Sequence, residues 1–212
     1  SHSISITNPH AGLELASTNP TISDFTSWGV TPDLTLKPEV AAPGGNIMSA
    51  VLGGEYRSMS GTSMATPQVA GITTLVRQRM NEDPAFKKLS ASEKTALVSN
   101  FLMGTAHPLV DLEQGDGTYY SPRRVGAGQV DALAATTSSV YPTVVGAPEQ
   151  SRPKADLGDG TKGWHFDVTL HNLSGVAATY ALSSQALSEI VDGGFFMQHS
   201  SDWRGRGVEI AY

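Results

Sequence analysis

The chain has 212 residues, which exceeds one average domain, and we expect two unequal domains. Its composition, 39% hydrophobic and 16% charged, is that of a globular protein with a buried core. A net charge of −6, with basic residues clustered no further than adjacent pairs such as Arg123 and Arg124, argues against nucleic acid as a partner.

The chain contains no cysteine, which excludes disulfides, and its low charge with many Gly, Ser and Thr residues favours a secreted bacterial protein. The sequence contains no window of about 18 apolar residues, which a membrane-spanning helix would need. Residues 1–7 lack the charged start and apolar stretch of a signal peptide. We therefore expect any secretion signal to lie outside this chain.

The first elements predicted along the chain are strands. Ile4 and Ile6 alternate with Ser and Thr from Ser3 to Thr7, which is strand periodicity. Pro38 and Pro43 bracket a short apolar run within Leu36 to Gly45, which suits a buried strand that ends in a loop.

Two helices follow. The first begins near Ser63 and runs to about Met80, with Pro67 expected near its first turn. Its expected buried face is Val69, Ile72, Leu75, Val76 and Met80. The second begins at the capping box of Ser90 and Glu93 and ends at Gly104. Its expected inner face is Ala96, Leu97, Phe101 and Leu102.

Beyond Ala135 the helical pattern ends, so we place a domain boundary near 137, with domains 1–137 and 138–212. Apolar residues alternate with polar ones from Trp164 to His171, as in a strand with one buried face. Residues 172–175 would turn this strand into a second one over Val176 to Leu182. The pattern predicts the start of an antiparallel β-sandwich.

The chemistry is concentrated in Ser58 to Gly71, SMSGTSMATPQVAG, a Gly-containing turn that places Ser63 at the start of an apolar helix. A serine hydroxyl needs a base to become nucleophilic, and an oxyanion needs hydrogen-bond donors. Unpaired N–H groups at a helix N-terminus supply such donors. From these residues alone the turn is ambiguous, and an ordinary N-capping turn is the commoner reading.

The longer string GTSMATPQVAG resembles the nucleophile segment of the subtilisin-like serine proteases. Three further stretches resemble segments around that serine, in the same order: FTSWG at Phe25 to Gly29, LKPEVAAPG at Leu36 to Gly44, and VGAGQVDA at Val125 to Ala132. The resemblance covers about residues 22–135. It implies an α/β fold with a parallel sheet in three layers and the serine at the start of a central buried helix.

The resemblance also implies roles for individual residues. Ser63 would be the catalytic nucleophile and would give its own N–H to the oxyanion, with support from Thr62. Substrate-binding positions would be Met59, Ser60, Gly61 and Met64, the last matching the family's oxidation-sensitive methionine. Simple turn packing is the alternative for Met59 and Ser60.

The other members of the catalytic triad have no match in this chain. In subtilisins the order is Asp, His, Ser, yet His2 and His10 lack the HGTH setting, and Asp24 and Asp33 lack the context of the family's acid. The upstream Asn8, Asn19 and Asn46 do not fit the oxyanion asparagine. We therefore expect these groups in the remainder of the catalytic domain upstream, and little activity from this chain alone.

The later histidines, His107, His165, His171 and His199, are poor candidates for a recruited base, and His165 and His171 are expected on the wet strand face.

One branch of the family, the bacterial cell-envelope proteinases of lactocepin and peptidase type, carries fibronectin-type sandwich domains after the catalytic domain. Residues 119–132 and 164–175 resemble that passage. The resemblance implies an extracellular or cell-envelope endopeptidase acting on proteins or peptides. A catalytically inactive interaction module is the alternative, whereas an α/β-hydrolase is set aside because residues 61–65 read GTSMA rather than GxSxG.

No cofactor is required by this chemistry, and no His, Asp or Glu cluster has the spacing of metal ligands. Family members frequently hold structural calcium, but the sequence identifies no site for it. Because a parallel sheet without its first strands would expose an apolar edge, we expect the chain to form a homo-oligomer.

Overall fold

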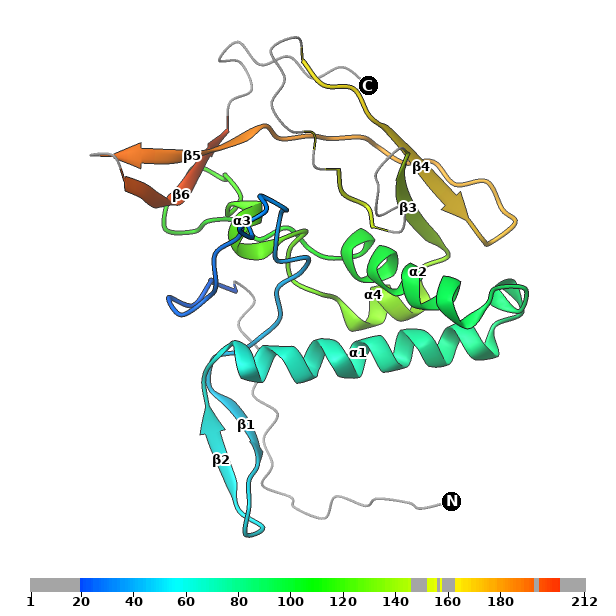
Figure 1. Cartoon of the computed structure of the whole chain (residues 1–212), viewed down its shortest axis with the longest axis horizontal. Coiled ribbons are helices and arrows are strands. Elements are labelled where there is room, and N and C mark those ends of the chain that lie inside the picture. The colour runs from blue at the N-terminus through cyan, green and yellow to red at the C-terminus, as the bar shows by residue number, and fades with distance from the viewer. Residues whose placement is uncertain (1–19, 146–151, 156, 158–162, 193–194, 203–212) are drawn as a thin grey trace.

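The computed structural model describes residues 20–145, 152–155, 157, 163–192 and 195–202 (Figure 1). The strand predicted from Ser3 to Thr7 lies outside these residues. The described elements, in chain order, are β1 (Ile47–Ala50), β2 (Tyr56–Met59), α1 (Thr62–Glu82), the 3₁₀ turn η1 (Pro84–Phe86), α2 (Ala91–Gly104), α3 (Pro122–Val125), α4 (Ala132–Thr137), β3 (Val140–Val145), β4 (Asp167–Asn172), β5 (Leu187–Asp192) and β6 (Phe195–Asp202).

The first predicted helix is α1, one residue longer at its start than expected and two at its end. Pro67 is its sixth residue, beyond the first turn, so the carbonyl of Ser63 has no N–H four residues ahead. Val76 and Met80 are buried and Val69 and Ile72 are partly buried, as predicted. Leu75 was wrongly placed on the inner face, because it lies at the flank of this stripe and is 50% exposed.

The second predicted helix is α2, and its capping box is confirmed. The Ser90 hydroxyl accepts a hydrogen bond from the Glu93 N–H, and the Glu93 carboxylate accepts one from the Ser90 N–H. Phe101 and Leu102 are buried as expected, and Val98 and Asn100, which the prediction omitted, are buried with them.

The core lies where α1, η1, α2 and α4 meet. Its buried side chains are Val76, Met80, Phe86, Val98, Phe101, Leu102, Val130 and Ala135. The rings of Phe86 and Phe101 meet edge to face at 5.9 Å, and the Arg79 guanidinium lies over both. The fully buried residues that α1 contributes to this cluster, Val76 and Met80, both lie in the C-terminal half of the helix.

The expected parallel sheet is not seen among the described residues. The strand predicted within Leu36 to Gly45 makes only one β-bridge among the described residues, a parallel one between Ala41 and Gln129. The N–H of Ala41 donates to Gly128, and its carbonyl accepts from Val130. Val40 and Ala42 turn their backbone groups the opposite way, where the described chain supplies no partner. An extended segment bonded on one edge by one bridge is not a sheet.

The expected β-sandwich is also not seen among the described residues. β4 pairs antiparallel with β3, not with residues 176–182, and β5 pairs only with β6. The predicted buried face of β4 is open, since Trp164, Phe166, Val168 and Leu170 are 45–58% exposed. Conversely, His171 is half-buried and stacks on Tyr141 at 4.6 Å, so its expected place on the wet face was wrong.

β3 packs directly on α2. The Tyr141 ring lies 5.3 Å from that of Phe101, and the Asn100 side-chain amide donates to the Pro142 carbonyl at 2.7 Å. The strand after the proposed boundary is thus anchored on the helical region before it.

Candidate active site

The structure brings together the four stretches that carry the family resemblance, numbered here in chain order, so that the serine segment is the third. The N–H of Gly29 donates to the Arg123 carbonyl, joining the first stretch to the chain just before the fourth. The N–H of Ala127 donates to the Glu39 carbonyl, which joins the second stretch to the fourth. The second and third meet at Gly44 and Gly61, where the Gly61 N–H donates to the Gly44 carbonyl at 2.8 Å.

Gly61 makes the turn from β2 into α1. It is the N-cap of α1, with φ 152° and ψ 163°, a positive φ that glycine adopts without strain. A Cβ on Gly44 would lie 2.8 Å from the Gly61 carbonyl oxygen and 3.3 Å from the Cβ of Ala65. The two glycines therefore let the second stretch approach the helix closely.

The N-terminus of α1 keeps free donors beside Ser63. No side chain caps the helix. Within the described part of the chain, no backbone carbonyl accepts from the N–H of Thr62 or Ser63, whereas the Met64 N–H donates to Gly61. Ser63 is exposed, and no described group bonds to its hydroxyl. An exposed hydroxyl next to unpaired N–H groups at the positive end of a helix offers a nucleophile and donors for an oxyanion, whereas acyl transfer to serine also requires a base.

Three residues to which the sequence assigned no role in this turn hold it. The Gln68 amide donates to the Pro43 carbonyl at 2.7 Å, and the Asn46 N–H donates to the Ser60 hydroxyl at 2.8 Å. Gly44, which has no side chain, lets the second stretch approach the start of α1 closely, as described above. The APGGN string from Ala42 to Asn46 carries the turn-forming glycines that could have revealed this role.

The predicted substrate-binding residues form one continuous stretch before and after Ser63. Met59, the last residue of β2, is 49% exposed, while Ser60 uses its hydroxyl to hold Asn46. The interaction of Ser60 supports its turn-packing alternative. Met64 is half-buried, and its sulfur would lie 3.7 Å from a Cβ placed on Gly61.

None of the histidines whose side chains the structure describes bonds to Ser63. His107 pairs with Asp131 at 2.8 Å, His165 lies 3.4 Å from Asp167, and His171 bonds Thr143. The pKa of Asp131 is lowered first by the Ala134 N–H and then by the His107 ring. His2 and His10 lie outside the described residues. No base for Ser63 is therefore present in the described part of the chain.

The upstream aspartate Asp33 is held within its own turn. Hydroxyls of Thr31 and Thr35 donate to its carboxylate, and the first of these bonds contributes most to lowering its pKa. The hydrogen bonds of the Asp33 carboxylate thus stay within the turn from Thr31 to Thr35. Among the described residues, no group of three His, Asp or Glu side chains could hold a metal ion.

A cavity of about 1000 Å³ lies along the N-terminal half of α1. Thr62, Ala65 and Val69 line it from α1, Leu102 from α2, and Val40 to Gly45 from the second recognised stretch. Val40 and Ala42, whose backbone groups have no partner in the described chain, are among these lining residues.

Comparison with known proteins gives several matches. Residues 4–128 match the family described as "Subtilase family". The chain is 34% identical over 175 residues to a C5a peptidase of Streptococcus pyogenes serotype M1, covering 82% of this chain and 14% of that protein. It is 37% identical over 170 residues to a PII-type proteinase of Lactococcus lactis subsp. cremoris, covering 77% of this chain and 9% of that protein.

Among solved structures, the Clostridium perfringens CspB protease is 29% identical with a TM-score of 0.40, covering 50% of this chain and 21% of that one. The chain thus spans a small part of the relatives it matches. The match over more than half of the chain confirms the resemblance expected from the serine segment, and the chain belongs to the subtilase family of serine peptidases.

Proposed function

We propose that Ser63 is the nucleophile of a subtilisin-like serine endopeptidase. The observation that carries the proposal is the exposed Ser63 hydroxyl beside the unpaired N–H groups of Thr62 and Ser63, within the described chain, at the start of α1. Its oxygen attacks the peptide carbonyl as a base takes its proton. The amine then leaves with a proton, and water hydrolyses the acyl-enzyme.

The neighbouring residues take supporting roles in this proposal. The N–H of Ser63, with Thr62 beside it, stabilises the oxyanion. Met59, Ser60, Gly61 and Met64 border the bound peptide, and Ser60 also holds Asn46. The chemistry needs no cofactor.

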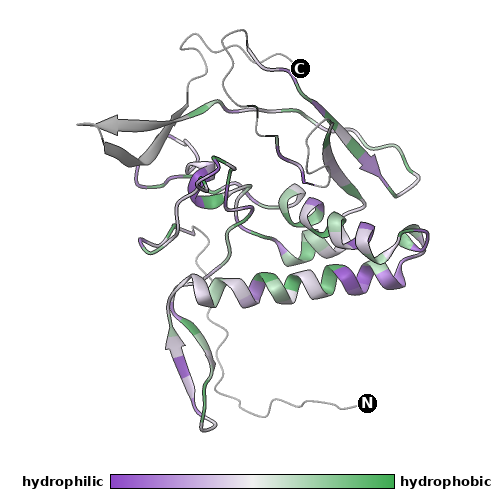
Figure 2. Ribbon diagram, viewed as in Figure 1, coloured by the Kyte–Doolittle hydropathy of each residue, from purple (hydrophilic) through white to green (hydrophobic). Residues whose placement is uncertain are grey.

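The base and its orienting acid come from the remainder of the catalytic domain. Two features of the described chain support the proposal that it packs against this remainder. The backbone groups of Val40 and Ala42 line the cavity without a partner in the described chain, whereas backbone groups that become buried in a folded protein are nearly always paired. Residues 62–76 contain no charge although several are exposed, and an uncharged helix is typical of an interior. The first charged residue of α1 is Arg77, and Figure 2 shows the hydrophilic colour concentrated in the C-terminal half of α1.

The substrates in this proposal are proteins or peptides, and the enzyme works outside the cell or in the bacterial envelope. The named relatives, a C5a peptidase and a PII-type proteinase, support protein substrates. Within the described residues, no helix is long and apolar enough to cross a membrane. In this proposal residues 1–137 are the catalytic portion and residues 138–212 the start of a fibronectin-type domain, although no sandwich is seen among the described residues.

Labelling with a fluorophosphonate probe tests the proposal. We expect the intact enzyme to be labelled, its Ser63→Ala variant not to be, and a Ser49→Ala variant, which changes another exposed serine, to be labelled fully. We expect this chain alone to label weakly, because a nucleophile without its base retains little reactivity. Full labelling of the Ser63→Ala variant would refute the role of Ser63.

The second candidate is a catalytically inactive interaction module. It is favoured by the lack of a base beside Ser63 among the described residues. A folded intact protein that hydrolyses no protein and takes no probe would establish it.

A further inference from the structure

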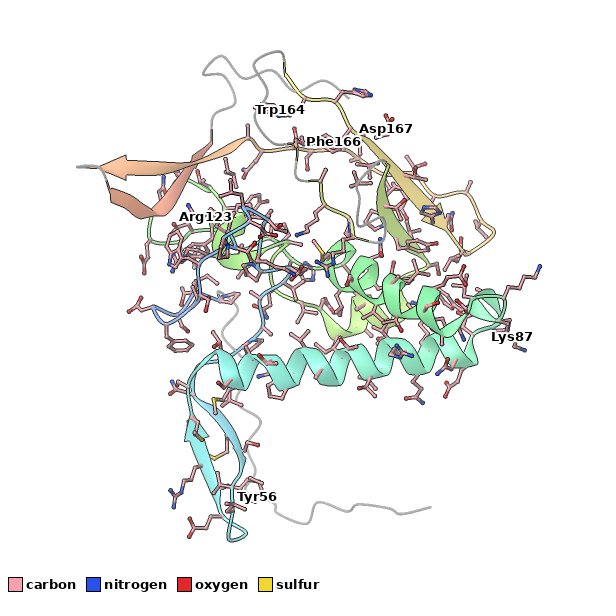
Figure 3. The ribbon with its side chains drawn as sticks, viewed as in Figure 1. Tyr56, Lys87, Arg123, Trp164, Phe166 and Asp167 are labelled. Atoms are coloured by element: carbon pink, nitrogen blue, oxygen red, sulfur yellow. The ribbon has the colours of Figure 1, made fainter. Side chains whose placement is uncertain are left out.

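The start of α1, which carries Ser63, has few anchors on the rest of the described chain. Figure 1 shows the β1–β2 hairpin, which leads into the Ser63 turn, extending from the start of α1 away from the helices, and Figure 3 shows Tyr56 near its far end. The fully buried residues of α1, Val76 and Met80, lie in the other half of the helix. Among the described residues, the position of the turn therefore depends on its contacts with the second stretch.

The first turn of α1 also lacks one of its own hydrogen bonds. Pro67 has no N–H, so the Ser63 carbonyl has no donor four residues ahead. The carbonyl before it, that of Thr62, accepts from the Thr66 hydroxyl at 3.0 Å, a bond that stays within the helix. Because the helix ladder is incomplete here, bonds from outside the helix matter more for the place of Ser63.

Gln68 supplies such an outside bond. It is half-buried, and its side-chain amide donates to the Pro43 carbonyl at 2.7 Å. The next carbonyl along the chain, that of Gly44, accepts from the N–H of Gly61, the N-cap of α1, at 2.8 Å. Glycines at 44 and 45 leave the backbone free to rotate, so a fixed Pro43 carbonyl restricts where the Gly44 carbonyl can lie.

We propose that Gln68 is a positioning residue for Ser63. Its bond to Pro43 sets the Gly44 carbonyl, which holds the Gly61 N–H and thereby sets the Ser63 hydroxyl and N–H against the peptide carbonyl. Gln68 acts through the backbone rather than on the substrate. Reacting groups must be held to within about 0.5 Å, and a misplacement of about 1 Å can cost about a hundredfold in rate. The proposal rests on the proposed function of Ser63.

The test measures kcat and KM of the intact enzyme on a peptide from the insulin B chain. Gln68→Met keeps the length of the side chain and removes its donors, whereas Gln68→His restores a donor in the ring N–H. Gln78→Met is the matched control, because it makes the same change in α1 at an amide that bonds Glu82 at 2.9 Å, within the helix. Complete labelling with the fluorophosphonate probe counts the folded active sites, so a loss of folded protein is not read as a loss of kcat.

We expect Gln68→Met to lower kcat per labelled site about tenfold and to change KM less than about twofold, because a displaced nucleophile weakens the transition state more than substrate binding. Gln78→Met should match the unaltered enzyme, and Gln68→His should recover most of kcat. An unchanged kcat in Gln68→Met, an equal fall in Gln78→Met, or no recovery in Gln68→His would overturn the proposal. If Gln68→Met does not fold, Gln68→Asn, whose shorter amide cannot reach Pro43, takes its place with the same expectations.

If the unaltered enzyme cleaves no peptide and takes no probe, the proposed function fails, and hydrogen exchange decides the role of Gln68 separately. In the intact protein, Gln68→Met must speed exchange of the Gly61 N–H about fivefold, since its acceptor is held less firmly. Gln78→Met must leave this exchange unchanged. Mass spectrometry of the peptides that cover the Ser63 turn measures both, and equal exchange in the two variants would overturn the proposal whether or not the enzyme is active.

Discussion

Glycines, more than the residues with reactive groups, set the position of the candidate nucleophile. Ser63 is exposed, and its place depends on Gly61 at positive φ and on Gly44, against which the turn closes. The sequence string identified Ser63 and its turn. It did not identify Gly44, Asn46 or Gln68, because the contacts of these residues with the turn join segments 14–25 residues apart.

We predict that Gly44→Ala destabilises the turn while Gly45→Ala does not. The new Cβ at residue 44 would lie 2.8 Å from a backbone oxygen, whereas the one at residue 45 would meet only the Ser23 hydroxyl at 3.7 Å. We expect a loss of about 1–3 kcal/mol in the free energy of unfolding for the first and less than about 0.5 kcal/mol for the second. Urea denaturation measures both, and equal losses would contradict this account.

At the scale of elements, local signals predicted the helices well and the strands poorly. The capping box at Ser90 and the apolar period of α1 depend on residues three and four apart, which the sequence shows directly. Strand pairing depends on distant partners, so β4 was paired with the wrong segment. The β1–β2 hairpin was missed, although Gly53 and Gly54 at its tip, both at positive φ, are a turn signal.

We predict that Asp131 stabilises α4 in a pH-dependent way. Its carboxylate caps the helix by accepting from the Ala134 N–H at 2.8 Å and pairs with His107, and these bonds lower its pKa below the model-peptide value of 3.8. A lowered folded-state pKa gives stability that is fully present above the unfolded pKa and is lost as pH falls through the folded one. Replacement by alanine should cost about 1 kcal/mol at neutral pH.

The matched variant is Asp131→Asn, which keeps a capping oxygen but cannot ionise. As the pH falls from neutral to below 3.8, this variant should lose less unfolding free energy than the unaltered chain, because it has no carboxylate at residue 131 to protonate. Urea denaturation at each pH measures both losses. An acid loss as large as that of the unaltered chain would show that Asp131 is not its source.

At the scale of the whole molecule, charged side chains tie the β3–β4 connection to the peptidase region. Glu39 accepts from Arg152 at 2.8 Å and also pairs with Lys37, while the Lys154 ammonium donates to the Leu36 carbonyl at 2.6 Å. Arg152 and Glu39 are 30% and 26% exposed, compared with 68% and 61% for the hairpin pair Arg57 and Glu55. Lower exposure reduces screening by water.

We predict that a double-mutant cycle on Glu39→Gln and Arg152→Ala gives a coupling energy of about 0.5–1 kcal/mol. The same cycle on Glu55→Gln and Arg57→Ala should give about 0.2 kcal/mol or less. Unfolding free energies of the four proteins in each cycle supply both values. Equal couplings would mean that the Glu39 cluster does not anchor the connection.

The uncharged half of α1 and the open edge at Val40 and Ala42 lead to a prediction about association. The parallel sheet implied by the family resemblance is not seen among the described residues, and both of these surfaces line the cavity. We expect the isolated chain to self-associate through them, and light scattering over a concentration series measures this.

Ala70→Lys places a charge beside the cavity and should keep the chain monomeric, because an unpaired buried charge is costly. Gln78→Lys, on the charged half of α1, should associate like the unaltered chain. A monomer at all concentrations would show that these surfaces do not drive association.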